Sequence, residues 1–318
     1  MRMVLALATL LTASLGHAQE APRNLPERVI DVHLHFYPED MKVPPVPYRG
    51  ADPAGRTAPM PKTGAELREL TIAAMQRNNI VIGMISMATG NPGQFEIARN
   101  WQVEGGPKIL VGGSSRTVMG EQTPEQVASL YDAGDMFYLG ELGLQYLGHT
   151  LDEAKFEPYL AIAEAKGIPV AIHTGLGSPE MARGPAPDFR IDMGNPLRLE
   201  EVLIRHPKLK IWAMHAGFPW DAEMFAIMQQ FTNVYVDLGV HTWLMPQDVF
   251  DARLKWLMDM GMGKRIMFGT DQMFWPQAID EAVAKVENSA VLTREQKDDI
   301  FYNNAVRFFG FDDSPDSD

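Results

Sequence analysis

Short apolar runs alternate with amphipathic stretches along most of the chain, and this alternation constrains the fold more than any other feature. Helix start and stop signals separate the runs, such as Thr123-Pro124 before one helical stretch and Gly167 after another. Strands that alternate with helices are typical of a parallel sheet, so we expect an α/β fold. The runs occupy residues 28–35, 80–87, 108–115, 136–143, 168–175, 209–217, 234–239 and 265–271.

Eight strand–helix units favour a (β/α)8 TIM barrel, for which about 250 residues are typical. An open doubly wound sheet is the alternative, but no glycine-rich phosphate loop follows the first run. We therefore predict a single TIM-barrel domain over residues 19–311. A long Pro- and Gly-rich loop, residues 38–62, should follow the first strand, either as a lid over a site or as a passive surface excursion.

The N-terminus has the parts of a secretory signal peptide: Arg2, then an apolar core, then small residues at Gly16 and Ala18. We expect residues 1–18 to be removed and the protein to be exported, to the periplasm or the medium. A membrane anchor is the alternative, although the apolar run is shorter than the roughly 20 residues that a span needs. We expect the acidic tail, residues 312–318, to be disordered.

Composition excludes several kinds of chemistry. The chain has no cysteine, so it has no disulfide, thiolate metal site, cysteine nucleophile or lipid anchor on cysteine. Its net charge of −13 disfavours nucleic acid as a partner, because such binding depends largely on cationic contacts. We expect a small-molecule substrate and no membrane contact after signal cleavage; a homo-oligomer stays open.

The carboxyl ends of the expected strands carry imidazoles and carboxylates, and a barrel brings those ends together. Unpaired polar groups are costly to bury there, and a divalent cation offsets that cost. Neutral imidazole together with carboxylate suits Zn²⁺, with Mn, Co, Ni or Fe as alternatives. The six residues are His33, His35, Glu141, His173, His215 and Asp271.

These segments together resemble the amidohydrolase superfamily, and in particular the amidohydrolase-related family that includes aminocarboxymuconate-semialdehyde decarboxylase. The resemblance rests on "IDVHLHFYP", "HTG", "GNPLRLEEVLIRHPKLKIWAMHAG", "FGTDQMFWP" and "YNNAVRFFG". It implies that one metal ion is held by His33, His35, His173 and Asp271. It also implies that His215 polarises the substrate or a water molecule.

Glu141 departs from the simplest one-metal pattern. Its segment "GELGLQY" is similar to that of TatD-type nucleases, whose glutamate bridges two metals. In that case His33, His35 and Asp271 would hold one ion, and His173 and His215 the second. The alternative is that Glu141 hydrogen-bonds to a ligand or to the substrate.

The resulting hypothesis is a metal-dependent hydrolase that acts on an amide, ester or lactone-type bond. Asp271 would take the proton from the attacking water, and His215 would stabilise the oxyanion. Non-oxidative decarboxylation of an aromatic or muconate-like acid, and an exported metal- or solute-binding protein without turnover, are the alternatives. A nuclease is disfavoured by the acidic charge.

Three residues that follow strand ends are candidates for binding the substrate. Arg190 could grip a substrate carboxylate or form a loop salt bridge. His241 follows the seventh run and could line the pocket. Trp220 could form part of an apolar wall, or it could simply pack between loop and helix.

Overall fold

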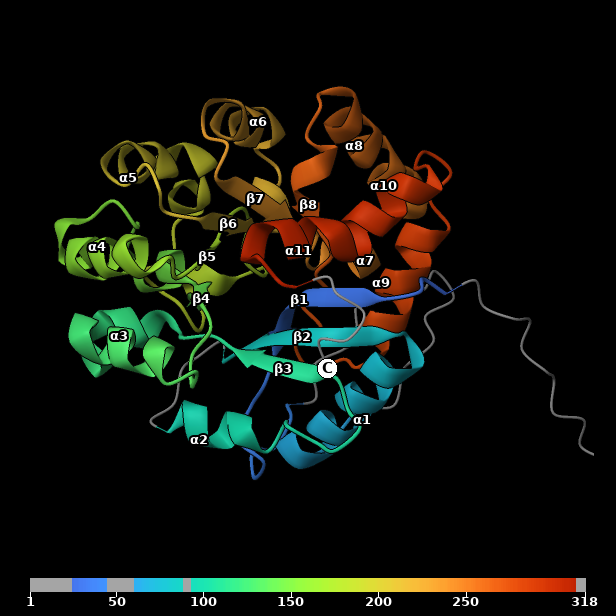
Figure 1. Cartoon of the computed structure of the whole chain (residues 1–318), viewed down its shortest axis with the longest axis horizontal. Coiled ribbons are helices and arrows are strands. Elements are labelled where there is room, and N and C mark those ends of the chain that lie inside the picture. Colours follow the sequence, from blue (N-terminus) through green and yellow to red (C-terminus); the bar gives the residue numbers. More distant parts are fainter. Residues whose placement is uncertain (1–24, 45–59, 88–92, 313–318) are drawn as a thin grey trace, which may run out of the picture.

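Parallel strands form a ring, and helices surround it (Figure 1). The computed structural model describes residues 25–44, 60–87 and 93–312. In this part of the chain the strands are β1 (Val29–His35), β2 (Ile80–Ser86), β3 (Lys108–Val111), β4 (Leu139–Leu142), β5 (Val170–His173), β6 (Ile211–Met214), β7 (Val234–Asp237) and β8 (Ile266–Met267). Every strand pair in the ladders is parallel, which confirms the predicted (β/α)8 architecture.

The helices follow the strands in sequence, and the predicted capping signals form. Thr123 accepts a hydrogen bond from Gln126 N, Gln126 Oε1 accepts one from Thr123 N, and Gly167 adopts a left-handed conformation after its helix. The helices are α1 (Gly64–Arg77), α2 (Gln94–Arg99), α3 (Pro124–Asp132), α4 (Glu157–Lys166), α5 (Glu200–Arg205), α6 (Asp221–Gln230), α7 (His241–Leu244), α8 (Gln247–Asp259), α9 (Gln277–Glu287), α10 (Arg294–Asp298) and α11 (Asn304–Phe309).

The strands form two ladders, β1–β2–β3 and β4–β5–β6–β7–β8, which meet at two seams. At the seam between β3 and β4, Gly112 bridges Tyr138, and Phe137 N donates to Val111 O at 2.7 Å. The chain is thus a TIM barrel in which individual contacts, rather than one continuous ladder, join the two sheets.

The seam between β8 and β1 brings the two ends of the barrel sequence together. Val32 N donates to Phe268 O at 3.0 Å, and Asp271 N donates to His33 O at 2.7 Å. All seven residues of β1 are buried, as expected for a strand covered on both faces. This seam places the end of β1 beside the loop that follows β8.

A small apolar cluster lies below the strand ends inside the barrel. Trp212 of β6 contacts the ring of Tyr138, with ring centroids 5.4 Å apart, and also faces the His33 ring at 6.3 Å. Ala305 and Phe308 of α11 belong to the same cluster. This packing gives the strand-end residues a rigid apolar floor.

The base of the predicted loop at residues 38–62 is pinned by backbone hydrogen bonds. Val43 N donates to Lys62 O at 3.0 Å, and Gly64 N donates to Met41 O at 2.9 Å. Residues 45–59 of this loop, the predicted signal peptide at 1–18 and residues 313–318 of the tail lie outside the described residues, so those expectations stay predictions. Among the described helices, none combines the length and the apolar character needed to cross a membrane.

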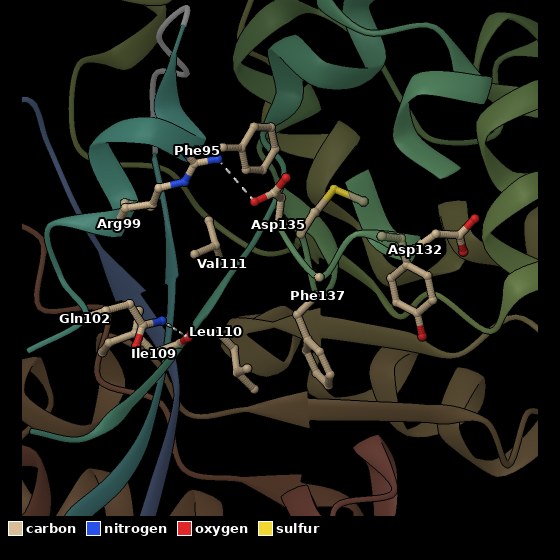
Figure 2. A pocket seen from close by; sticks show the side chains of 13 residues that line it. Phe95, Arg99, Gln102, Ile109, Leu110, Val111, Asp132, Asp135 and Phe137 are labelled. Atoms are coloured by element: carbon tan, nitrogen blue, oxygen red, sulfur yellow. Dashed lines mark hydrogen bonds and ion pairs between the residues drawn. The ribbon is translucent and has the colours of Figure 1, made fainter. Parts of the chain in front are cut away.

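A cavity of about 630 Å³ lies between α2, β3 and the segment that leads from α3 into β4 (Figure 2). Its walls combine apolar side chains, such as Phe95, Ile109 and Phe137, with polar ones, and Arg99 pairs with Asp135 across 3.4 Å. None of the six strand-end residues lines it. The cavity is therefore separate from the predicted site.

We predict that Gly112→Ala destabilises the barrel by about 1–3 kcal/mol, the usual range for overpacking. A Cβ at Gly112 would lie 2.2 Å from Gly140 O and 2.4 Å from Tyr138 Cζ, across the β3–β4 seam. Gly113→Ala is the matched control, since its added Cβ would meet only side-chain atoms, at 3.2 Å or more. Urea unfolding of both variants measures the difference; an equal or larger loss in Gly113→Ala would contradict it.

Candidate metal centre

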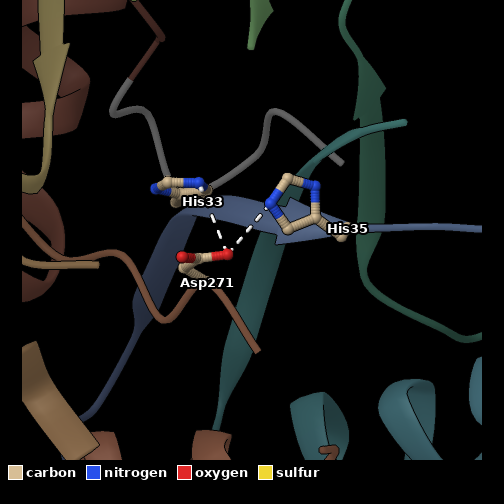
Figure 3. A group of neighbouring side chains, drawn as sticks. All are labelled: His33, His35 and Asp271. Atoms are coloured by element: carbon tan, nitrogen blue, oxygen red, sulfur yellow. Dashed lines mark ion pairs between the residues drawn. The ribbon is translucent and has the colours of Figure 1, made fainter. Parts of the chain in front are cut away.

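The end of β1 and the segment that follows β8 bring two imidazoles and a carboxylate together, as predicted (Figure 3). Asp271 Oδ1 lies 2.9 Å from His35 Nε2 and 3.8 Å from His33 Nε2. All three residues are buried, and their ligand atoms lie within 4.8 Å of one another. This first group could hold a metal ion.

Glu141, in β4, reaches the same place and contacts three histidines. Its Oε2 lies 3.3 Å from His35 Nε2 and 3.6 Å from His33 Nε2, while its Oε1 lies 3.7 Å from His215 Nε2. His33, Glu141 and His215 form a second group of possible ligands, which shares His33 with the first. The sequence left open whether Glu141 is a ligand, and these contacts favour that role.

The residues fit a divalent cation by the atoms that they leave unsatisfied. His33 Nε2 and Asp271 Oδ1 are buried and have no hydrogen-bond partner in the described structure. Buried polar atoms are normally satisfied, so each such atom calls for an explanation. A metal ion bound by nitrogen and oxygen would satisfy both atoms.

The shifted pKa values of the cluster also favour a bound cation. Burial alone would lower the pKa of His33, but the carboxylates of Asp237 and Asp271 outweigh it and raise that pKa well above its usual value. The pKa of His35 rises to about 9 because the neighbouring carboxylates of Asp271 and Glu141 outweigh its burial. Burial would raise the pKa of Glu141, yet the neighbouring imidazoles of His215, His33 and His35 hold it well below its usual range. Carboxylates that stabilise protons on imidazoles would also stabilise a cation there.

His173 stands apart from both groups. Its Nε2 is 2.9 Å from the hydroxyl of Tyr146, and its ring lies 4.5 Å from that of His215, centroid to centroid. Burial and the neighbouring His215 lower the pKa of His173 to about 3, so the ring is neutral and its Nε2 shares one hydrogen bond with the Tyr146 hydroxyl. His173, a predicted ligand, thus lies beside the cluster, and its Nε2 is hydrogen-bonded to Tyr146. The role of His173 as a metal ligand stays a prediction.

The backbone that carries the cluster is held by two side chains at the β8–β1 seam. Asp31 Oδ1 accepts from His33 N at 3.1 Å and from Thr270 N at 3.0 Å. The amide of Gln272 exchanges two hydrogen bonds with the backbone of His35, at 2.9 and 2.8 Å. Burial raises the pKa of Asp31 to about 7, although its hydrogen bonds from Thr270 and His33 act to lower it. These contacts lock β1 against the segment that carries Asp271.

Of the predicted substrate-binding residues, His241 lies near the cluster. Its ring is 6.3 Å from that of His215, and its Nδ1 accepts from Arg253 Nη1 at 2.9 Å. Burial and the Arg253 guanidinium hold the pKa of His241 well below its usual value, so the ring is neutral. Because an arginine always donates, the proton of this imidazole is on Nε2.

Arg190 and Trp220 have less direct placements. Within the described residues, Arg190 is exposed and its guanidinium donates to the carbonyls of Pro187 and Phe189 rather than to the cluster. Arg190 forms no loop salt bridge among the described residues. Trp220 is half-buried and precedes α6. Their contacts with a substrate stay predictions.

Reasoning from the sequence missed three residues around the cluster. Asp237, at the end of β7, lies 3.1 Å from His33 Nδ1 through its Oδ2. Tyr146 reaches His173 from the loop after β4, and Arg253 reaches His241 from α8. A strand-end position was a usable signal for Asp237 in "VYVDLG", whereas the sequence carries no comparable signal for the other two.

The chain matches the family model described as Amidohydrolase over residues 125–311, more than half of its length. Among curated proteins it is similar to protein fluG of Emericella nidulans, with 23% identity over 164 residues. That match covers 47% of this chain but only 18% of the fluG protein.

Three solved structures share the fold. An uncharacterized TIM-barrel protein from Bordetella bronchiseptica has a TM-score of 0.63 and 20% identity, over 89% of this chain and 98% of that one. A probable 2-pyrone-4,6-dicarboxylic acid hydrolase from Acinetobacter baumannii, with citric acid bound, has a TM-score of 0.61 and 13% identity, over 89% of this chain and 100% of that one. A dihydroxybenzoic acid decarboxylase from Polaromonas sp. JS666, with manganese and the inhibitor 2-nitroresorcinol, has a TM-score of 0.59 and 16% identity, over 90% of this chain and 97% of that one.

We predict that Glu141→Gln lowers the metal bound per chain, because a neutral amide is a weaker ligand and its NH₂ group would face imidazoles. Elemental analysis of purified protein measures the content. Two equivalents that fall to one or none would make Glu141 a bridging ligand, and one equivalent that falls below one would make it a ligand of a single ion. Glu153→Gln is the matched control. Glu153 also contacts a histidine, with 3.1 Å between its Oε2 and His149 Nδ1, but it is not part of the cluster. Unchanged content in Glu141→Gln would exclude Glu141 as a ligand.

Proposed function

The chain belongs to the amidohydrolase family, and from this premise we propose that it is a metal-dependent hydrolase of small molecules. In the proposed reaction, a water molecule attacks an amide, ester or lactone-type bond. The observation that carries the proposal is the position of the Asp271 carboxylate, buried beside the histidines of β1. Its Oδ1 is buried and lies 2.9 Å from His35 Nε2, but the two atoms do not have the geometry of a hydrogen bond.

A bound divalent cation would acidify a water molecule and polarise a carbonyl group. Asp271 is then the base that takes the proton of the attacking water and returns it to the leaving group. Its backbone φ of 50° places it in a region that non-glycine residues seldom adopt, as is common at active sites. His215, with Nε2 3.7 Å from Glu141 Oε1, is the group that stabilises the developing oxyanion.

Substrate contacts are assigned to His241 first. Its neutral ring, held by Arg253, presents an Nε2–H donor next to His215, suited to a carbonyl or carboxylate oxygen of the substrate. Trp220 and Arg190 are proposed to contact the substrate farther from the cluster.

Zn²⁺ is the proposed metal, since buried imidazole and carboxylate suit it. Export after removal of residues 1–18 remains part of the proposal.

Decarboxylation of an aromatic or muconate-like acid is the second candidate. The observation that favours it is the fold shared with the manganese-containing dihydroxybenzoic acid decarboxylase. Within the described residues, Arg253 donates to Asp221 and His241, and Arg190 donates to a carbonyl of its own loop. A substrate carboxylate would have to compete with these protein contacts for either guanidinium, and for this reason we place hydrolysis first.

We predict that Asp271→Asn lowers kcat by about 10²–10⁴-fold, the usual contribution of a general base. Asparagine keeps an oxygen for the metal but cannot accept the proton, so much of the metal should remain bound. The assay is a panel of esters, lactones and amides with the metal-loaded protein, followed by metal analysis of each variant. Asp259→Asn is the control, because Asp259 pairs with Lys255 on the exposed face of α8.

Retained turnover in Asp271→Asn would exclude Asp271 as the base. Release of carbon dioxide from aromatic or unsaturated acids, without hydrolysis of any panel member, would establish the decarboxylase instead. A protein that binds metal and turns over neither class would support a binding protein.

A further inference from the structure

We propose that Asp237 is a positioning residue that aligns two members of the cluster, His33 and His215, for the metal ion. Asp237 is the last residue of β7 and is fully buried. No role was predicted for Asp237 from the sequence, and it is not among the proposed ligands. The inference rests on the metal-binding part of the proposed function.

One carboxylate oxygen of Asp237 orients the His33 ring through its Nδ1 atom. Asp237 Oδ2 accepts from Trp212 Nε1 at 2.7 Å and lies 3.1 Å from His33 Nδ1. A carboxylate is an acceptor, so it holds a proton on Nδ1 and leaves Nε2 as the nitrogen that a metal ion would bind. That Nε2 faces the cluster and has no hydrogen bond of its own. A carboxylate behind a ligating histidine is known to raise its basicity and hold its orientation.

The other carboxylate oxygen holds the backbone that aims His215. Asp237 Oδ1 accepts from His215 N at 3.1 Å and from Gly239 N at 2.8 Å. His215 has φ 62° and Ala216 has φ 47°, so the chain makes a left-handed turn that such residues seldom adopt. The surroundings must hold this turn, and Asp237 does so at its first residue. Each oxygen of one carboxylate thus serves a different histidine.

Two glycines leave the space that this arrangement needs. A Cβ at Gly239 would lie 2.7 Å from His33 Nδ1 and 3.0 Å from Asp237 Oδ1. A Cβ at Gly269 would lie 2.9 Å from His33 Cβ and 3.2 Å from Asp237 Cγ. Neither glycine has a positive φ, so close approach, and not backbone freedom, is what requires glycine here.

The test compares two variants of the full-length chain with the wild type. Asp237→Asn removes the charge and turns one acceptor into a donor, which would face the Trp212 or His33 proton. Gly239→Ala keeps every donor and acceptor but pushes His33 and Asp237 apart. After removal of metal with a chelator, Zn²⁺ affinity is measured by chelator competition, and Co²⁺ absorption reports the ligand geometry. Thermal unfolding of the metal-free proteins reports stability, and Asp259→Asn is the control.

We expect both variants to bind Zn²⁺ about 10–100-fold more weakly, as is usual when the partner of a ligating histidine is lost. We also expect the Co²⁺ spectrum to shift. Zn²⁺ affinity within about twofold of the wild type, with an unchanged Co²⁺ spectrum, would overturn the proposal even if stability fell, because Asp237 would then be merely structural. If Asp237→Asn does not fold, Gly239→Ala decides alone.

These outcomes are separate from the fate of the proposed function. The probe is the metal ion alone, so a failed hydrolase assay leaves the role of Asp237 standing. A wild-type chain that binds neither Zn²⁺ nor Co²⁺ would overturn the metal site itself, and with it this inference.

Discussion

The whole site depends on how the first strand is fastened to the segment after the last one. Asp31 joins the backbone of His33 to Thr270, and Gln272 pairs with the backbone of His35. Asp31 and Gln272 are fully buried, so water does not compete for these hydrogen bonds. They hold both histidines of β1 opposite Asp271.

The strand ends then concentrate polar groups where a barrel is otherwise apolar. Three imidazoles surround Glu141, and Trp212 and Tyr138 form an apolar floor beneath them. Burying such groups without partners is unfavourable by several kcal/mol each when they are charged. The left-handed turn at His215 adds backbone strain to this. A site that carries both is built around a ligand rather than for stability alone.

Much of this was predictable from the sequence, for identifiable reasons. The alternation of strands and helices predicted the barrel, and the spacing of His33 and His35 placed both on one face of a strand. Placement of functional residues at strand ends then brought Glu141, His215 and Asp271 to the same region. These predictions depend on the backbone path alone, and the structure confirms that the residues converge.

Atomic partners were not predictable, because they depend on side-chain rotamers and on loops. Tyr146, from a loop, takes the Nε2 of His173 and leaves that residue outside both groups of possible ligands. Arg253 comes from α8, and nothing in its local sequence points to His241. Asp237 stood at a strand end, but its contacts with β1 and β6 exist only in the folded barrel.

The β8–β1 seam also has a consequence for how the protein acquires its site. His35 and Gln272 are 237 residues apart in sequence, and Glu141 and His215 come from segments in between. Closing such a long loop is entropically unfavourable until most of the barrel has formed. The cluster is therefore assembled late, and a cation that binds it recognises the completed ring rather than any part of it. Metal binding then stabilises the native state selectively, because the unfolded chain offers no comparable set of ligands.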